Sequence, residues 1–131
     1  MDRLLVDATD MYYRNKRLDY LKFLQFLGRD FESKELFLLD FDTKTQSFQT
    51  RMAEMGFQVH VAQRHRMEEK SCSLLLGARL LLAEKDEATW FVVSNDLSLQ
   101  NILTSVRNKV VTVGYEPLSK NHVLLHRGLE M

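Results

Sequence analysis

Short apolar runs of strand length alternate along this chain with segments whose apolar residues recur at helical spacing. Five such runs occur, each separated from the next by a segment long enough to hold a helix. Strands that are joined through helices pair in parallel and are covered on both faces. The alternation therefore predicts a three-layer α/β/α fold with a five-stranded, mostly parallel sheet, whose first strand lies between the second and the fourth. The expected strands are Arg3–Asp7, Glu35–Asp40, Phe57–Ala62, Thr89–Ser94 and Lys109–Gly114.

The expected helices occupy the segments between these strands. Apolar residues recur at helical spacing from Leu18 to Leu27, and Gly28 ends that pattern. Three further helices are expected at Thr43–Met55, Cys72–Glu84 and Leu97–Val106. A last short strand is expected at His122–His126.

Length, charge and cysteine content restrict the class of protein. The 131 residues show no repeat and no change in composition, so one domain spanning residues 1–131 is expected. No apolar stretch approaches the ~20 residues of a membrane helix, and no membrane partner is expected. The 18 basic and 18 acidic residues cancel, which argues against non-specific coating of nucleic acid but leaves a local basic patch open. The single Cys72 excludes an internal disulfide and favours a reducing, cytoplasmic location.

Acidic residues follow three of the predicted strands. Asp7 ends the first and Asp10 follows it, Asp40 and Asp42 end the second, and Asp96 follows the fourth. Because ligands of open α/β sheets bind at the carboxyl ends of the strands, we expect these acids at one edge. Clustered carboxylates need a cation, and hard oxygen ligands suit Mg²⁺ or Mn²⁺. The chemistry that this pattern indicates is metal-assisted phosphodiester hydrolysis.

A structural interpretation of the same acids stays open. Acidic residues after strands also begin helices and form turns. In that case, Asp10 and Asp96 each cap the helix that follows.

Several segments together resemble the NYN domain, a branch of the PIN-like nuclease superfamily with a Rossmann-like α/β/α fold. They are the opening Leu4–Tyr12 (LLVDATDMY), then Met55–Val61 (MGFQVHV), Lys70–Leu75 (KSCSLL), Val93–Leu99 (VSNDLSL) and Val111–Tyr115 (VTVGY). The resemblance covers nearly the whole chain and implies a divalent-metal-dependent ribonuclease. It implies that Asp7 and Asp96 are catalytic acids that hold Mg²⁺ or Mn²⁺.

The chain departs from the NYN pattern at three of these positions. Asp10 stands where the family has asparagine, which adds a third candidate for catalysis and metal binding. Ser73 and Ser98 stand where the family has two further acids, and Asp40 or Asp42 are candidates to compensate. The alternative to a weak ribonuclease is therefore a catalytically degenerate PIN-like domain that binds RNA or a protein partner.

Basic and aromatic residues near the expected edge are candidates for binding single-stranded RNA. Tyr12 and Arg14 follow the first strand, and Arg64 and Arg66 follow the third. Aromatic rings stack on bases and cations hold the phosphates of a single strand. A protein partner or a homo-oligomer is also compatible with the sequence.

A second family competes on a shorter motif. The segment from Leu36 to Thr45 (LFLLDFDTKT) resembles the haloacid-dehalogenase phosphatase motif. That resemblance implies Asp40 as nucleophile and Asp42 as general acid/base, with Ser94 in the second motif.

Overall fold

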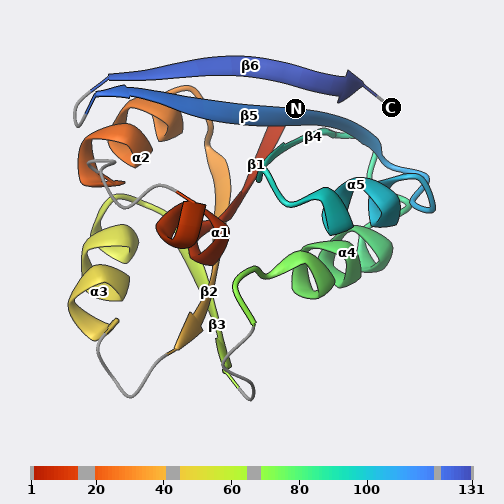
Figure 1. Cartoon of the computed structure of the whole chain (residues 1–131). Coiled ribbons are helices and arrows are strands. Elements are labelled where there is room, and N and C mark those ends of the chain that lie inside the picture. Colours follow the sequence, from red (N-terminus) through yellow and green to blue (C-terminus); the bar gives the residue numbers. More distant parts are fainter. Residues whose placement is uncertain (1, 15–19, 41–44, 65–68, 120–121, 131) are drawn as a thin grey trace.

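The chain forms one six-stranded sheet with the strand order β3-β2-β1-β4-β5-β6 (Figure 1). The computed structural model describes residues 2–14, 20–40, 45–64, 69–119 and 122–130. β1 pairs in parallel with β2 and β4, β2 with β3, and β4 with β5, so the expected central position of β1 is confirmed. The strands are β1 (Asp2–Asp7), β2 (Ser33–Asp40), β3 (Gln58–Gln63), β4 (Thr89–Val93), β5 (Lys109–Ser119) and β6 (His122–Glu130).

The sheet gains an antiparallel sixth strand that is longer than the short segment expected at its place. β5 continues to Ser119, and β6 runs back along it from His122 to Glu130. The short connection between Ser119 and His122 permits only antiparallel pairing, because a parallel return needs a crossover. The three-layer α/β/α class is as expected, with five parallel strands and one added hairpin strand.

Helices cover both faces of the sheet. α1 (Ala8–Arg14), α2 (Tyr20–Gly28) and α3 (Gln46–Glu54) share one hydrophobic core on the first face. α4 (Ser73–Leu82) and α5 (Leu97–Leu103) share a second core on the other face. No helix within the described ranges is long and apolar enough to cross a membrane.

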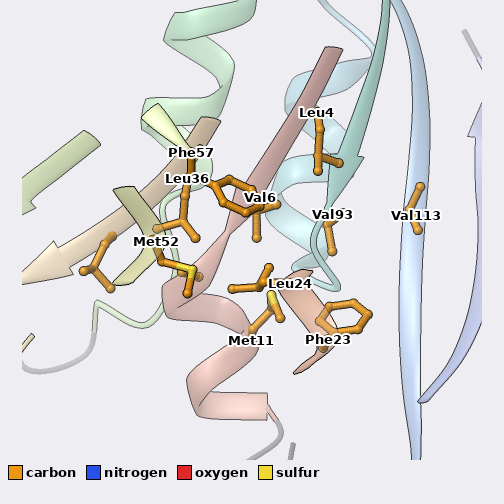
Figure 2. Close-up of a cluster of buried hydrophobic side chains, with 12 residues drawn as sticks. Leu4, Val6, Met11, Phe23, Leu24, Leu36, Met52, Phe57, Val93 and Val113 are labelled. Carbon is orange, nitrogen blue, oxygen red and sulfur yellow. The ribbon is translucent and has the colours of Figure 1, made fainter. Parts of the chain in front are cut away.

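The strands divide their side chains between the two cores by simple alternation. Leu4 and Val6 of β1 belong to the core on the first face, and Figure 2 shows Val6 close to Leu24 of α2 and Met11 of α1. Leu5, between them in sequence, belongs to the second core. A strand buried on both faces reads as a continuous apolar run, which is why the sequence pattern identified β1.

The sequence pattern did not predict α1, the first helix. α1 begins directly after β1 at Ala8, so Asp10 lies inside its first turn rather than before a helix. The expected helix from Leu18 to Leu27 corresponds to α2, which begins at Tyr20. α1 has only seven residues, which is too short to show a helical period.

Hydrogen bonds from Arg79 and His60 to the buried Glu35 carboxylate hold α4 over the sheet. Arg79 of α4 donates from Nε and Nη2 to the Glu35 carboxylate of β2, at 2.8 and 3.0 Å. His60 of β3 lies 2.7 Å from the same carboxylate. Burial opposes ionisation of Glu35, but the hydrogen bonds from Arg79 and His60 outweigh it and hold the pKa of Glu35 below its ordinary value.

The contact between α4 and α5 leaves no room for a side chain at Gly77. A Cβ atom at this position would lie 2.6 Å from Cγ2 of Ile102. We expect Gly77→Ala to lower the free energy of unfolding by about 1–2 kcal/mol, although alanine is the better helix former. In an Ile102→Ala background the same substitution should instead stabilise the fold, by up to about 1 kcal/mol. Urea unfolding of the four proteins checks this, and equal effects of Gly77→Ala in both backgrounds would contradict the steric account.

Candidate functional site at the carboxyl edge of the sheet

Asp7, the last residue of β1, is completely buried where the two layers of helices meet the sheet edge. Its Oδ1 atom accepts a hydrogen bond of 3.0 Å from the backbone N–H of Asp10, which is the bond of a helix N-cap. Both carboxylate oxygens also accept from the backbone N–H of Cys72, at 3.1 and 3.0 Å. Asp7 therefore joins the start of α1 to the segment that leads into α4.

Asp10 is also buried, with 2% of its surface exposed. Its Oδ2 atom accepts from the backbone N–H of Asn95 at 2.8 Å and from Ser94 Oγ at 3.4 Å. These bonds connect α1 to the segment that follows β4. Asp10 lies inside the first turn of α1, and Asp7 rather than Asp10 makes the N-cap hydrogen bond of this helix.

Asp96 does cap a helix, as that interpretation expected. Its Oδ1 accepts a 3.1 Å hydrogen bond from the backbone N–H of Ser98 at the start of α5. Its Oδ2 accepts from Ser71 Oγ at 2.6 Å and, in a short bond, from Ser73 Oγ. Ser73 therefore supplies a hydroxyl donor to Asp96.

The electrostatics of the edge favour a proton on Asp7. Burial is the largest cause and raises the pKa of Asp7 to about 7, while the backbone hydrogen bonds from Asp10 and Cys72 lower it. The negative charges of Asp10 and Asp96 raise it further, which places both near Asp7. Burial and the charge of Asp7 also raise the pKa of the Cys72 thiol to about 12, so Cys72 is no nucleophile at neutral pH.

The acidic side chains at this edge are not arranged as a metal centre. Oxygen ligands of the kind that Mg²⁺ or Mn²⁺ prefers are present. Within the ranges that the structure describes, however, no three His, Cys, Asp or Glu side chains converge to hold an ion. Asp7 and Asp10 face backbone N–H groups, and Asp96 faces two serine hydroxyls.

A hollow of about 580 Å³ opens beside Asp96, between the start of α4 and the start of α5. Asp96 is part of its wall, whereas Asp7 and Asp10 are not. The lining combines apolar side chains, hydroxyls and charges; it comprises Leu39, Ala62, Gln63, Glu69, Lys70, Ser71, Ser73, Leu74, Leu75, Asp96, Ser98 and Ile102. We call this space the edge hollow.

An aromatic and cationic cluster lies next to the edge hollow. Arg64 donates a 2.7 Å hydrogen bond from Nη1 to the Tyr13 hydroxyl, and its guanidinium lies 5.5 Å from the centre of the Tyr13 ring. Lys70 Nζ lies 5.6 Å from the same ring. Tyr12 packs edge-on against Tyr13, with ring centres 5.1 Å apart, and remains 48% exposed. We call Tyr12, Tyr13, Arg64 and Lys70 the cation–aromatic cluster.

The structure thus brings together some of the residues expected from the sequence. Asp7, Asp10 and Asp96 meet at one edge, and Arg64 and Tyr12 lie in one cluster. Asp40 ends β2 and accepts a 2.6 Å hydrogen bond from Thr45 Oγ1. Asp42, Arg66 and the side chain of Arg14 lie outside the described residues.

The sequence pattern assigned no role to Ser71 or Lys70, although both lie in the segment Lys70–Leu75 that resembles the NYN domain. That segment was the available signal, and the neighbouring pair Tyr12 and Tyr13 was the signal for the aromatic part of the cluster. Single polar residues in connecting segments have no periodicity, so only the folded chain shows their contacts.

Comparisons with known proteins agree with this fold. The sequence matches none of the known family models and none of the curated proteins. Among solved structures, the chain is similar to a protein of unknown function from Vibrio parahaemolyticus RIMD 2210633, with a TM-score of 0.63 and 19% sequence identity. The similarity covers 86% of this chain and 80% of that chain. At this identity it shows a shared fold and nothing about function.

The raised pKa of Asp7 makes the stability of the domain depend on pH. The folded state holds the Asp7 proton more tightly than the unfolded chain does. The stabilisation of the fold by the Asp7 proton is therefore complete below about pH 4 and is lost as the pH rises to about 7. The loss lowers the free energy of unfolding by up to about 4 kcal/mol. Asp7→Asn should remove this dependence on pH. The difference in the free energy of unfolding between the wild type and Asp7→Asn should therefore change between pH 4 and 7 and be constant above pH 8. Denaturant unfolding across this range measures it, and parallel pH profiles would contradict the account.

Proposed function

We propose that this chain is a degenerate PIN-like domain of the NYN type, which binds single-stranded RNA and cleaves it slowly or not at all. The observation that supports this proposal is the hydrogen bonding of Asp7, Asp10 and Asp96, together with the burial of the first two. Asp7 and Asp10 are buried and bonded to backbone N–H groups, and Asp96 is bonded to Ser71 and Ser73. Acids held in this way connect strands and helices, and of the three only Asp96 also lines the edge hollow.

The cation–aromatic cluster supports the RNA-binding part of the proposal. Arg64 and Lys70 supply two positive charges around the Tyr13 ring, and Tyr12 offers an exposed ring beside them. Cations hold the phosphates of a single strand, and exposed rings stack on its bases. The zero net charge of the chain makes such binding local rather than spread over the surface.

A metal-dependent ribonuclease is the second candidate. The observation in its favour is that the charges of Asp10 and Asp96 both reach Asp7, so three carboxylates do share one edge. The haloacid-dehalogenase hypothesis lacks a comparable observation. Asp40 is bonded to Thr45, and Asp42 lies outside the described residues.

Removal of either cation in the cluster should weaken RNA binding. We expect Arg64→Ala and Lys70→Ala each to reduce the affinity for a single-stranded RNA oligomer. The slope of log K against the logarithm of the salt concentration should also become shallower, by about 0.7 for each phosphate that is no longer neutralised. Lys85→Ala, an exposed lysine between α4 and β4, is the matched control and should bind as the wild type does. Fluorescence anisotropy over a series of salt concentrations measures both quantities. Unchanged binding by both cluster variants would refute the proposed surface.

Replacing one serine should be enough to create a metal site. Ser73 Oγ touches Asp96, so Ser73→Asp places two carboxylates side by side, and this arrangement needs a cation. We expect Mn²⁺ to raise the melting temperature of this variant by roughly 4 °C for each ~1 kcal/mol of binding. The wild type should show no such rise.

Leu74→Asp is the matched control for this experiment. It adds the same charge at the next position of α4, on a side chain that is 82% exposed. A response of the wild type to Mn²⁺ that disappears in Asp7→Asn would favour the ribonuclease candidate instead.

A further inference from the structure

We infer that the edge hollow holds one unstacked nucleobase of the bound strand and prefers a base whose edge is rich in hydrogen-bond donors. This inference rests on the proposed binding of single-stranded RNA and adds a position at which the strand is read. It follows from the dimensions of the hollow, its lining, its continuity with the cation–aromatic cluster and its charge.

The size and lining of the edge hollow suit a planar heterocycle. Its volume of about 580 Å³ lies within the range of roughly 300–1,000 Å³ that is typical of small-molecule sites. Leu39, Leu75 and Ile102 contribute apolar surface, while Ser98 and Gln63 contribute groups that both donate and accept hydrogen bonds. Apolar surface with a few polar groups is how proteins hold a base that has left its stack.

Leu74 gives this hollow an apolar rim. It lines the hollow, yet 82% of its surface is exposed to solvent. The face of an inserted base would cover this side chain and remove apolar surface from water. Leu82, on the same helix, is 86% exposed but does not line the hollow.

Lys70 connects the hollow to the cation–aromatic cluster. It is one of the lining residues of the hollow, and its Nζ atom lies 5.6 Å from the centre of the Tyr13 ring. A strand whose phosphates contact Lys70 and Arg64 therefore passes the mouth of the hollow. The base at that point is within reach of the lining, and the neighbouring base is within reach of Tyr12.

The charge of the lining determines which base is preferred. Glu69 and Asp96 contribute carboxylates to the wall and Lys70 contributes one ammonium group, so the charged groups of the wall are net negative. A negative wall favours base edges that present N–H groups and disfavours edges dominated by carbonyl oxygens. Guanine presents an N1–H and an N2 amino group on its Watson–Crick edge, whereas uracil presents one N–H between two carbonyl oxygens. The expected preference is guanine over uracil.

The test compares two RNA oligomers of equal length, one composed only of uridine and one with a single central guanosine. Fluorescence anisotropy with the wild-type chain should give an affinity about three- to tenfold higher for the guanosine oligomer. Glu69→Gln, which removes one carboxylate from the wall, should reduce this preference to near one, and Leu74→Ala should lower the affinity for both oligomers because it removes apolar surface that any inserted base would cover. Leu82→Ala, the equally exposed control, should keep the preference.

The outcomes separate this inference from the proposed function. If both oligomers bind equally well to the wild type, the base site is wrong and RNA binding stands. If Glu69→Gln keeps the preference, or if Leu74→Ala binds both oligomers as tightly as Leu82→Ala does, the hollow is not the site that reads the base. If neither oligomer binds, the proposed function and the inference are both overturned.

Discussion

The hydrogen bonds between Asp7 and the backbone of Asp10 and Cys72 are the interaction on which the rest of the site depends. The central strand of the sheet ends in a carboxylate that is completely buried. Water cannot solvate it there, so the chain must supply donors, and it supplies N–H groups from α1 and from the segment before α4. One side chain thereby sets where helices on both faces of the sheet begin.

The other two acids make similar connections near the end of the neighbouring strand β4. Asp10 reaches from α1 to the backbone after β4, and Asp96 reaches from the start of α5 to Ser71, before α4, and to Ser73, the first residue of α4. Each carboxylate therefore ties together elements that are far apart in sequence. These carboxylates stabilise the carboxyl edge of the sheet, and under the proposed function the cation–aromatic cluster and the edge hollow are the surfaces that bind RNA.

The sequence was sufficient to predict the layers and the central strand, because strands buried on both faces leave continuous apolar runs and the helices between them have a recognisable period. It was also sufficient to predict that Asp7, Asp10 and Asp96 lie at one edge of the sheet, because parallel strands end on the same side. It could not show that Ser73 donates to Asp96, or that Asp7 is bonded to Cys72, 65 residues away. Those contacts depend on how the connecting segments lie, and such segments have no periodic pattern. The seven-residue α1 was missed for the same reason.

The central claim is that hydrogen-bond donors of the chain, together with a proton on Asp7 at neutral pH and below, stabilise the acidic edge without a cation. A crystal soaked in Mn²⁺ above pH 8, where Asp7 is ionised, tests it most directly through the anomalous difference map. The account predicts no peak between Asp7 and Asp96 in the wild type and a peak beside Asp96 in Ser73→Asp, which serves as the positive control. A well-occupied peak coordinated by Asp7 and Asp96 in the wild type would contradict the account and identify a metal-dependent site.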